Sequence, residues 1–226
     1  MSAVLLPLLF ACMKAAYIDK ELEPGGYYSS ADSEERSTDH AIGTLRTRDG
    51  QRYIQLDAVS AGLVVNPDVV ADIPDETRVF LQYRCVLYSA ILPEFCSDAI
   101  LVEWATPLDT GEIRYDMSAY EGDPLAVNLD WMTSLEDGFL TLHYSIPSKG
   151  KASHGFSLYP GATPYEFRLV HDANGDTEGD LTDGLVCFRI GALLPDTGGK
   201  TVTLSLTYLY LDHTWKTLTV DYRTPK

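Results

Sequence analysis

The sequence predicts an all-β protein. Residues 130–221 consist of short runs in which apolar and polar residues alternate, and Gly, Pro or Asp clusters separate one run from the next. A period of two is the pattern of a strand with one buried face and one solvated face. The chain also contains 14 Tyr against seven Phe, a bias that suits pleated, half-buried surfaces. No amphipathic helix of convincing length interrupts this pattern.

The C-terminal half predicts an antiparallel β-sandwich over residues 127–226. Its apolar sets each occupy one face of a run, and turn residues separate the runs. About six or seven strands spaced in this way are typical of a sandwich. The apolar sets begin at Leu140, Tyr165, Val186, Val202 and Leu218.

The N-terminal half holds a second, smaller group of strands. Its runs lie at 42–48, 53–57, 78–88 and 99–104. Asp49 and Gly50 separate the first two runs and supply the positive φ angles that a tight hairpin needs. Short strands at this density predict a small barrel, or an open sheet curled on itself, over residues 41–105. Turn-rich residues 106–126 are expected to link the two domains.

The start of the chain has the features of an exported lipoprotein. Residues 1–11 are uncharged and mainly apolar, too short to span a bilayer and of the size of a signal-peptide core. Leu9 to Cys12 has the shape of a bacterial lipoprotein box, although no Lys or Arg precedes it. We expect Cys12 to be lipidated and residues 12–40 to form a polar tether. A plain signal peptide or a buried N-terminal strand are the alternatives.

The charge excludes some partners. The chain has 33 Asp and Glu against 17 Lys and Arg, a formal net charge of −16. This field repels nucleic acid and anionic lipid, so membrane contact is expected only through the anchor. Extracellular cationic peptides, proteins and neutral glycans remain candidate partners. We expect the protein in the cell envelope, at the outer membrane facing the periplasm or the cell surface.

A series of short motifs between about residue 41 and the C-terminus carries a family resemblance. The motifs are 131–133, 136–142, 171–177, 183–189 and 194–202. In this order and spacing they resemble the NigD-like proteins of Bacteroidetes. The resemblance implies an OB-like barrel followed by a β-sandwich. For function the resemblance implies little: the family is named after a gene of a bacteriocin cluster, with a proposed immunity role, and it supplies no catalytic residues.

One acidic loop resembles a calcium-binding loop. Oxygen-bearing side chains occupy its relative positions 1, 3, 5, 7, 9 and 12, as hard cations prefer. They are Asp172, Asn174, Asp176, Glu178, Asp180 and Asp183. Against calcium, Thr177 replaces the usual Gly, the last ligand is Asp rather than Glu, and no helices flank the loop. The alternative is a solvated loop built on turn chemistry at Asn174 and Gly175, and no other cofactor is expected.

The cysteines pose a second question. Cys85 and Cys96 flank a turn between two strands that we expect to pair, so a disulfide between them is predicted for an exported protein. The alternative is two small buried thiols. Cys187 is left without a partner, and no His or Asn is visibly placed to activate it, so we expect an inert residue.

The remaining motifs favour binding over catalysis. The five His residues lack metal-ligand spacing, and no serine-hydrolase or nucleotide-binding motif is present. We therefore expect a non-catalytic binding or immunity protein. A glycan-binding accessory lipoprotein is the first alternative, because Tyr208, Tyr210 and Trp215 near the last hairpin are able to stack on a sugar. A hydrolase with an unrecognised site is the second alternative.

Overall fold

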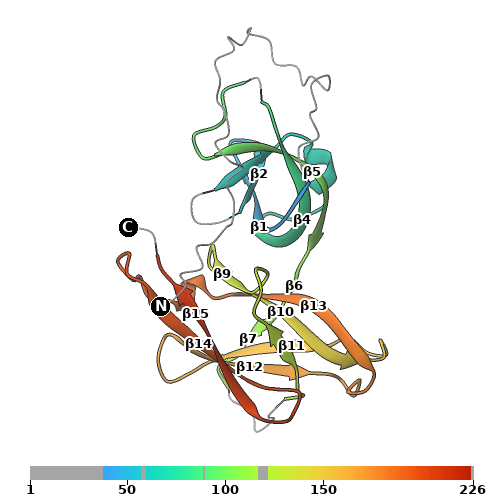
Figure 1. The fold of residues 1–226 in the computed structure, drawn as a ribbon. Coiled ribbons are helices and arrows are strands. Elements are labelled where there is room, and N and C mark those ends of the chain that lie inside the picture. The colour runs from blue at the N-terminus through green and yellow to red at the C-terminus, as the bar shows by residue number, and fades with distance from the viewer. Residues whose placement is uncertain (1–37, 57–59, 89, 117–121, 225–226) are drawn as a thin grey trace, which may run out of the picture.

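The computed structural model describes residues 38–56, 60–88, 90–116 and 122–224. The predicted leader at 1–11, Cys12 and nearly all of the predicted tether lie outside these residues. The fold is all-β, as predicted, with a five-stranded closed barrel followed by a two-sheet sandwich (Figure 1). In the described part of the chain, no helix is long and apolar enough to cross a membrane.

The barrel closes in the order β1-β2-β3-β5-β4. Its strands are β1 (Asp39–Arg48), β2 (Gln51–Gln55), β3 (Ala61–Val64), β4 (Thr77–Val86) and β5 (Asp98–Pro107), with the short 3-10 helix η2 (Pro67–Val70) between β3 and β4. The β1–β2 hairpin turns at Asp49 and Gly50, whose φ angles of 53° and 76° are those that the Asp-Gly pair predicts. Alternate residues point inward, and Leu45, Ile54 and Leu81 are fully buried in the barrel core.

The sandwich has two five-stranded sheets. One contains β6 (Asp109–Thr110), β13 (Asp180–Arg189), β10 (Phe139–Ser148), β8 (Ala126–Asn128) and β9 (Ser134–Glu136). The other contains β15 (Trp215–Tyr222), β14 (Val202–Leu209), β12 (Glu166–Asp172), β11 (Gly155–Pro160) and β7 (Glu112–Ile113). The 3-10 helix η3 (Gly191–Leu193) joins β13 to β14. The inner faces of both sheets form one apolar core that includes Leu140, Leu158, Phe188 and Leu204.

The segment between the domains is more structured than the sequence suggests. The sequence predicts a linker over residues 106–126, yet β6 and β7 lie within it. Strand β6 pairs in parallel with β13, and β7 pairs in parallel with β11. The chain therefore gives one short strand to each sheet of the sandwich as soon as it leaves the barrel.

Charged side chains connect the two domains. Arg46 on β1 bonds with Nε to Glu76 Oε1 at 2.8 Å and with Nη1 to Asp137 Oδ1 of the sandwich at 3.0 Å. Arg189 on β13 donates from Nη2 to the carbonyl oxygen of Glu76 at 2.6 Å. Glu76 and Asp137 both have positive φ angles, 60° and 53°, and so lie at tight turns that face each other across the junction.

A buried arginine lies at the centre of this junction. Arg78 on β4 is almost completely buried and donates from Nη1 to Thr44 Oγ1 at 3.2 Å. Its Nη2 lies 3.8 Å from Glu136 Oε2, and its guanidinium carbon lies 5.8 Å from the centre of the Phe139 ring. Burial lowers the pKa of Arg78, while the negative charge of Glu136 opposes that shift. The outer wall of the barrel is thus covered by the sandwich at this point.

Candidate functional site

The acidic loop does not form the calcium site that its spacing suggests. Asp176 is only 2% exposed, and its carboxylate accepts hydrogen bonds from the backbone N–H groups of Lys149 at 3.0 Å and Lys151 at 2.9 Å. It also accepts one from Ser148 Oγ at 2.9 Å. These bonds, led by the one from the Lys151 N–H, lower the pKa of Asp176. The carboxylate therefore stabilises the β10–β11 turn.

The other five candidate ligands face different partners. Asp172 Oδ1 accepts the N–H of Asn174 at 2.9 Å, Glu178 pairs with Lys149 Nζ at 2.6 Å, Asp183 accepts from Ser145 Oγ at 2.5 Å, and Asp180 lies opposite Ser148 in the β13–β10 ladder. Among the described residues, no group of three or more His, Cys, Asp or Glu side chains is arranged to hold a metal ion. The spacing matched calcium, but Asp172 ends β12 in one sheet, whereas Asp180 and Asp183 lie on β13 in the other.

Two histidines that are far apart in sequence form a buried pair in the sandwich. His154 Nδ1 and His171 Nε2 lie 2.8 Å apart, so one ring nitrogen donates to the other, and the rings stack with centroids 5.1 Å apart. His154 Nε2 lies 3.7 Å from Asp176 Oδ2. Burial lowers the pKa of His171, and the neighbouring His154 lowers it further. The sequence spacing of these two histidines does not predict their contact, because only the β11–β12 register brings them together.

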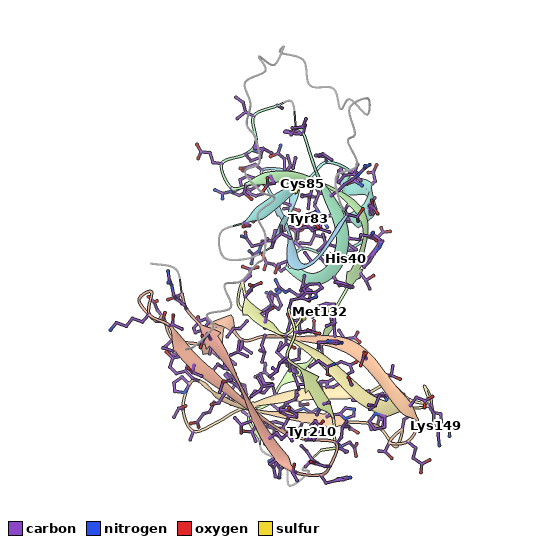
Figure 2. The ribbon with its side chains drawn as sticks, in the orientation of Figure 1. His40, Tyr83, Cys85, Met132, Lys149 and Tyr210 are labelled. Carbon is purple, nitrogen blue, oxygen red and sulfur yellow. The ribbon has the colours of Figure 1, made fainter. Side chains whose placement is uncertain are left out.

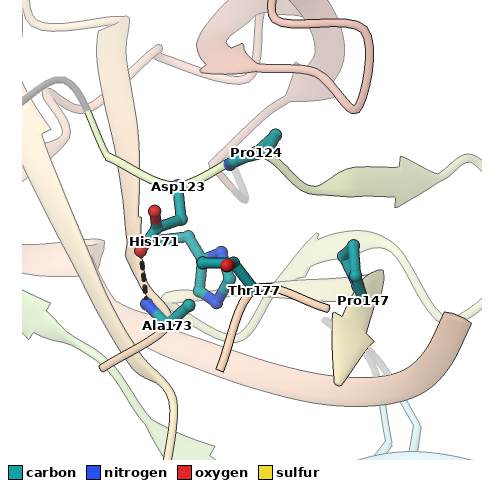
Figure 3. A pocket seen from close by; sticks show the side chains of 6 residues that line it. All are labelled: Asp123, Pro124, Pro147, His171, Ala173 and Thr177. Carbon is teal, nitrogen blue, oxygen red and sulfur yellow. Dashed lines mark hydrogen bonds between the residues drawn. The ribbon is translucent and has the colours of Figure 1, made fainter. Parts of the chain in front are cut away.

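His171 also lines a small pocket (Figure 3). Asp123 closes one side of it by accepting a hydrogen bond from the Ala173 N–H at 2.8 Å. The lining residues are Asp123, Pro124, Pro147, His171, Ala173 and Thr177. The pocket is too small for a peptide or sugar ring, so we assign it no catalytic or ligand-binding role.

The predicted disulfide between Cys85 and Cys96 is wrong, because Cys96 is a free, buried thiol. Cys85 pairs with Ile100 in the β4–β5 ladder, and the chain before β5 turns away from β4. There the Ser97 N–H donates to the carbonyl oxygen of Ala61 at 2.8 Å, which places this segment against β3. Burial raises the pKa of Cys96 to about 11, so the thiol stays protonated.

Cys187, which we expect to be inert, lies inside the sandwich. Its side chain is completely buried on β13, and its Sγ lies 3.6 Å from Thr110 Oγ1. Burial raises the pKa of Cys187, which disfavours the nucleophilic thiolate.

The aromatic residues near the last hairpin do not form one stacking platform. Tyr208 belongs to the sandwich core. The guanidinium carbon of Arg168 lies 4.5 Å from the centre of the Trp215 ring, and Lys216 Nζ lies 3.1 Å from the centre of the Tyr210 ring. One face of each of these two rings is therefore already covered by a cation of the same chain.

A different aromatic group gathers where the two domains meet. We call His40, Phe80, Trp104 and Trp131 the junction cluster. Phe80 is its centre, with ring centroids 5.9 Å from His40, 5.3 Å from Trp104 and 6.2 Å from Trp131. Trp104 and Trp131 remain 36% and 42% exposed. In Figure 2, His40 and Met132 mark this place at the lower end of the barrel, next to the sandwich.

The barrel part of the junction cluster is positioned by strand register. His40 on β1 pairs with Gln82 on β4, which in turn pairs with Trp104 on β5. The register then shifts, so that Tyr83 pairs with Val102 and Glu103 is an extra residue. This β-bulge leaves both Glu103 and Trp104 on the outer surface. The indole N–H of Trp104 donates to Gln82 Oε1, which orients the ring.

The sandwich part comes from the loop between β8 and β9. Asp130 holds this loop, since its Oδ1 accepts the N–H of Met132 at 2.9 Å and its Oδ2 lies 2.7 Å from His143 Nδ1. Trp131 is thereby placed beside Phe80. Sequence motifs could not reveal this cluster, because its members lie on three barrel strands and one sandwich loop.

Comparison with known proteins identifies the family. Residues 108–222 match the NigD-like C-terminal beta sandwich domain. No curated protein matches the chain.

Among solved structures, a protein of Parabacteroides distasonis described as toxin-related is 20% identical, with a TM-score of 0.68 over 83% of this chain and 94% of that one. A NigD-like immunity protein of Bacteroides caccae is 19% identical, with a TM-score of 0.57 over 88% of this chain and 100% of that one. A Bacteroides fragilis protein described as a candidate lipoprotein is 11% identical, with a TM-score of 0.56 over 84% and 100% of the two chains. At these identities the structures share the fold, and the domain match shows that this chain belongs to the NigD-like family.

Proposed function

We propose that this protein is an exported envelope lipoprotein, anchored through Cys12, that captures a cationic peptide without catalysis. One observation carries the proposal: the formal net charge of −16 on a chain of 226 residues. An excess of one charge raises the local concentration of oppositely charged ligands and speeds their association. A cationic peptide toxin is a ligand of this kind, and binding it fits an immunity role.

The charge excess is spread over both domains. Residues 38–107 hold ten Asp or Glu and five Arg, and residues 108–226 hold 17 Asp or Glu and nine Lys or Arg. A peptide is therefore attracted to the whole molecule, and its final position depends on local contacts. The lipoprotein box at Leu9 to Cys12 and the relatives described as an immunity protein and a candidate lipoprotein support the same reading.

A titration at two salt concentrations tests the proposal. The probe is an amidated hexa-arginine peptide, and a hexa-citrulline peptide of nearly the same shape but without charge is the control. We expect saturable, one-to-one binding of the arginine peptide that weakens about tenfold or more between 50 and 300 mM NaCl, because salt screens the attraction. Absence of binding at low salt, or equal binding of the citrulline peptide, contradicts the proposal.

A further inference from the structure

We propose that the junction cluster is the place where this protein holds an arginine or lysine side chain of its peptide ligand. The inference rests on the cationic-peptide capture proposed above and assigns that capture to one surface. A cation over the face of an aromatic ring is attracted by the ring quadrupole, and Trp is the best of the aromatic side chains for this contact.

The rings of Trp104 and Trp131 both pack against Phe80, so two indole rings lie around one phenyl ring. The rings of Trp104 and Trp131 lie on Phe80 at interplanar angles of 73° and 45°. Trp104 comes from β5 of the barrel and Trp131 from the β8–β9 loop of the sandwich, so the cluster is complete only when both domains are in place. It continues the domain junction at Arg78, where the outer wall of the barrel is already covered.

Carboxylates accompany the exposed rings. Glu103 precedes Trp104 and Asp130 precedes Trp131, and both acidic residues are exposed. The β-bulge is the reason that Glu103 shares the outer surface with Trp104. Negative charge on the residues next to the two indoles in the chain favours a cation over an anion.

The chain itself uses this contact elsewhere. Arg168 lies over Trp215, Lys216 over Tyr210 and Arg189 over Phe139, with distances of 4.5, 3.1 and 5.0 Å to the ring centres. Within the described ranges, no Lys or Arg of this chain lies over Trp104 or Trp131 in the same way.

The two rings are also held in place before a ligand arrives. The bond from Trp104 to Gln82 and the Asp130 contacts with Met132 and His143 fix the strand position and the loop on which the indoles lie. Groups that are already ordered lose little conformational entropy on binding, which favours affinity. The cluster is therefore ready to accept a side chain.

Tryptophan fluorescence of the full chain tests the inference, because the protein has only three Trp residues. Trp215→Phe leaves the two junction indoles as reporters, and the matched Trp104→Phe/Trp131→Phe variant leaves only Trp215. Hexa-arginine amide is the probe. We expect a saturable change in emission from Trp215→Phe, and no saturable change from the matched variant.

Affinity completes the test. Trp104→Ala/Trp131→Ala should weaken hexa-arginine binding about tenfold or more, since two ring contacts are removed. Circular dichroism and thermal melting establish that the variant is folded, and the Trp104→Phe/Trp131→Phe variant should lie between it and the wild type. If the wild type binds hexa-arginine and both variants bind it with the same affinity, the junction cluster is not the binding site. The proposed capture function is then still supported. No binding by the wild type overturns the capture function itself. A neutral oligosaccharide that alone changes the junction emission overturns the choice of occupant.

Discussion

Arg46 on the barrel donates to Asp137 on the sandwich across the domain junction, from Nη1 to Oδ1 at 3.0 Å. Both side chains are mostly buried, with relative exposures of 23% and 15%. The contact joins residues 91 positions apart and lies on the same wall of the barrel as the junction cluster. The Arg46–Asp137 contact therefore holds the two domains together beside the surface that we assign to the ligand.

Removing this contact should destabilise the protein. Arg46→Ala leaves the mostly buried carboxylate of Asp137 without its cation, so we expect the free energy of unfolding to fall by about 1–2 kcal/mol in urea. Arg114→Ala is the matched control, because Arg114 pairs with Glu112 only two residues away on the exposed surface. Equal effects of the two substitutions would show that the interdomain contact has no special weight.

Asp176 should make stability sensitive to acid. Its pKa is lowered in the folded state, so the folded protein binds fewer protons than the unfolded chain. The stabilisation is complete above the unfolded pKa of about 3.9 and is lost as pH falls through the folded value. Urea unfolding between pH 5 and pH 3 should show a steeper loss in the wild type than in Asp176→Asn. Parallel pH profiles would contradict this role.

The His154–His171 pair should respond at a higher pH. The pKa of His171 is lowered in the folded state, so stability is complete above the unfolded value of about 6.5 and falls as pH drops below it. A charge on the buried His171 ring is also disfavoured by the neighbouring His154, and the carboxylate of Asp123 offsets this only in part. We expect the urea midpoint of the wild type to fall between pH 7.5 and pH 5.5. His171→Phe, which can still stack on Phe156, should flatten that part of the profile.

Cys96 should resist thiol reagents in the native protein. The side chain is 9% exposed, and its pKa is raised to about 11, so little thiolate exists at pH 8. Iodoacetamide labelling followed by peptide mass mapping should leave Cys96 unmodified until urea unfolds the barrel. A non-reduced digest that contains a Cys85–Cys96 cross-link would contradict the structure.

Much of the fold could be predicted from local pattern. Period-two alternation in runs such as 78–88 and 140–146 identifies strands, because successive side chains of a strand point to opposite faces and only one face is buried. The Asp49–Gly50 turn followed from backbone chemistry in the same way. Strands β6 and β7 were missed because two-residue strands show no period, and only their parallel pairing with β13 and β11 defines them.

The site could not be predicted in this way. The calcium spacing was real in sequence, but Asp176 is occupied by the β10–β11 turn and Asp183 by Ser145. The cysteine prediction assumed a simple hairpin, whereas the chain around Cys96 follows β3. The junction cluster depends on a register shift in β5 and on contact between two domains. Neither the register shift nor the interdomain contact can be recognised from a short segment of sequence.

The most direct measurement compares hexa-arginine binding by the wild-type chain and by Trp104→Ala/Trp131→Ala at 50 and 300 mM NaCl. We predict salt-sensitive binding by the wild type and about tenfold weaker binding by the variant at the lower salt concentration. Equal, salt-insensitive affinities for the two proteins would contradict this prediction.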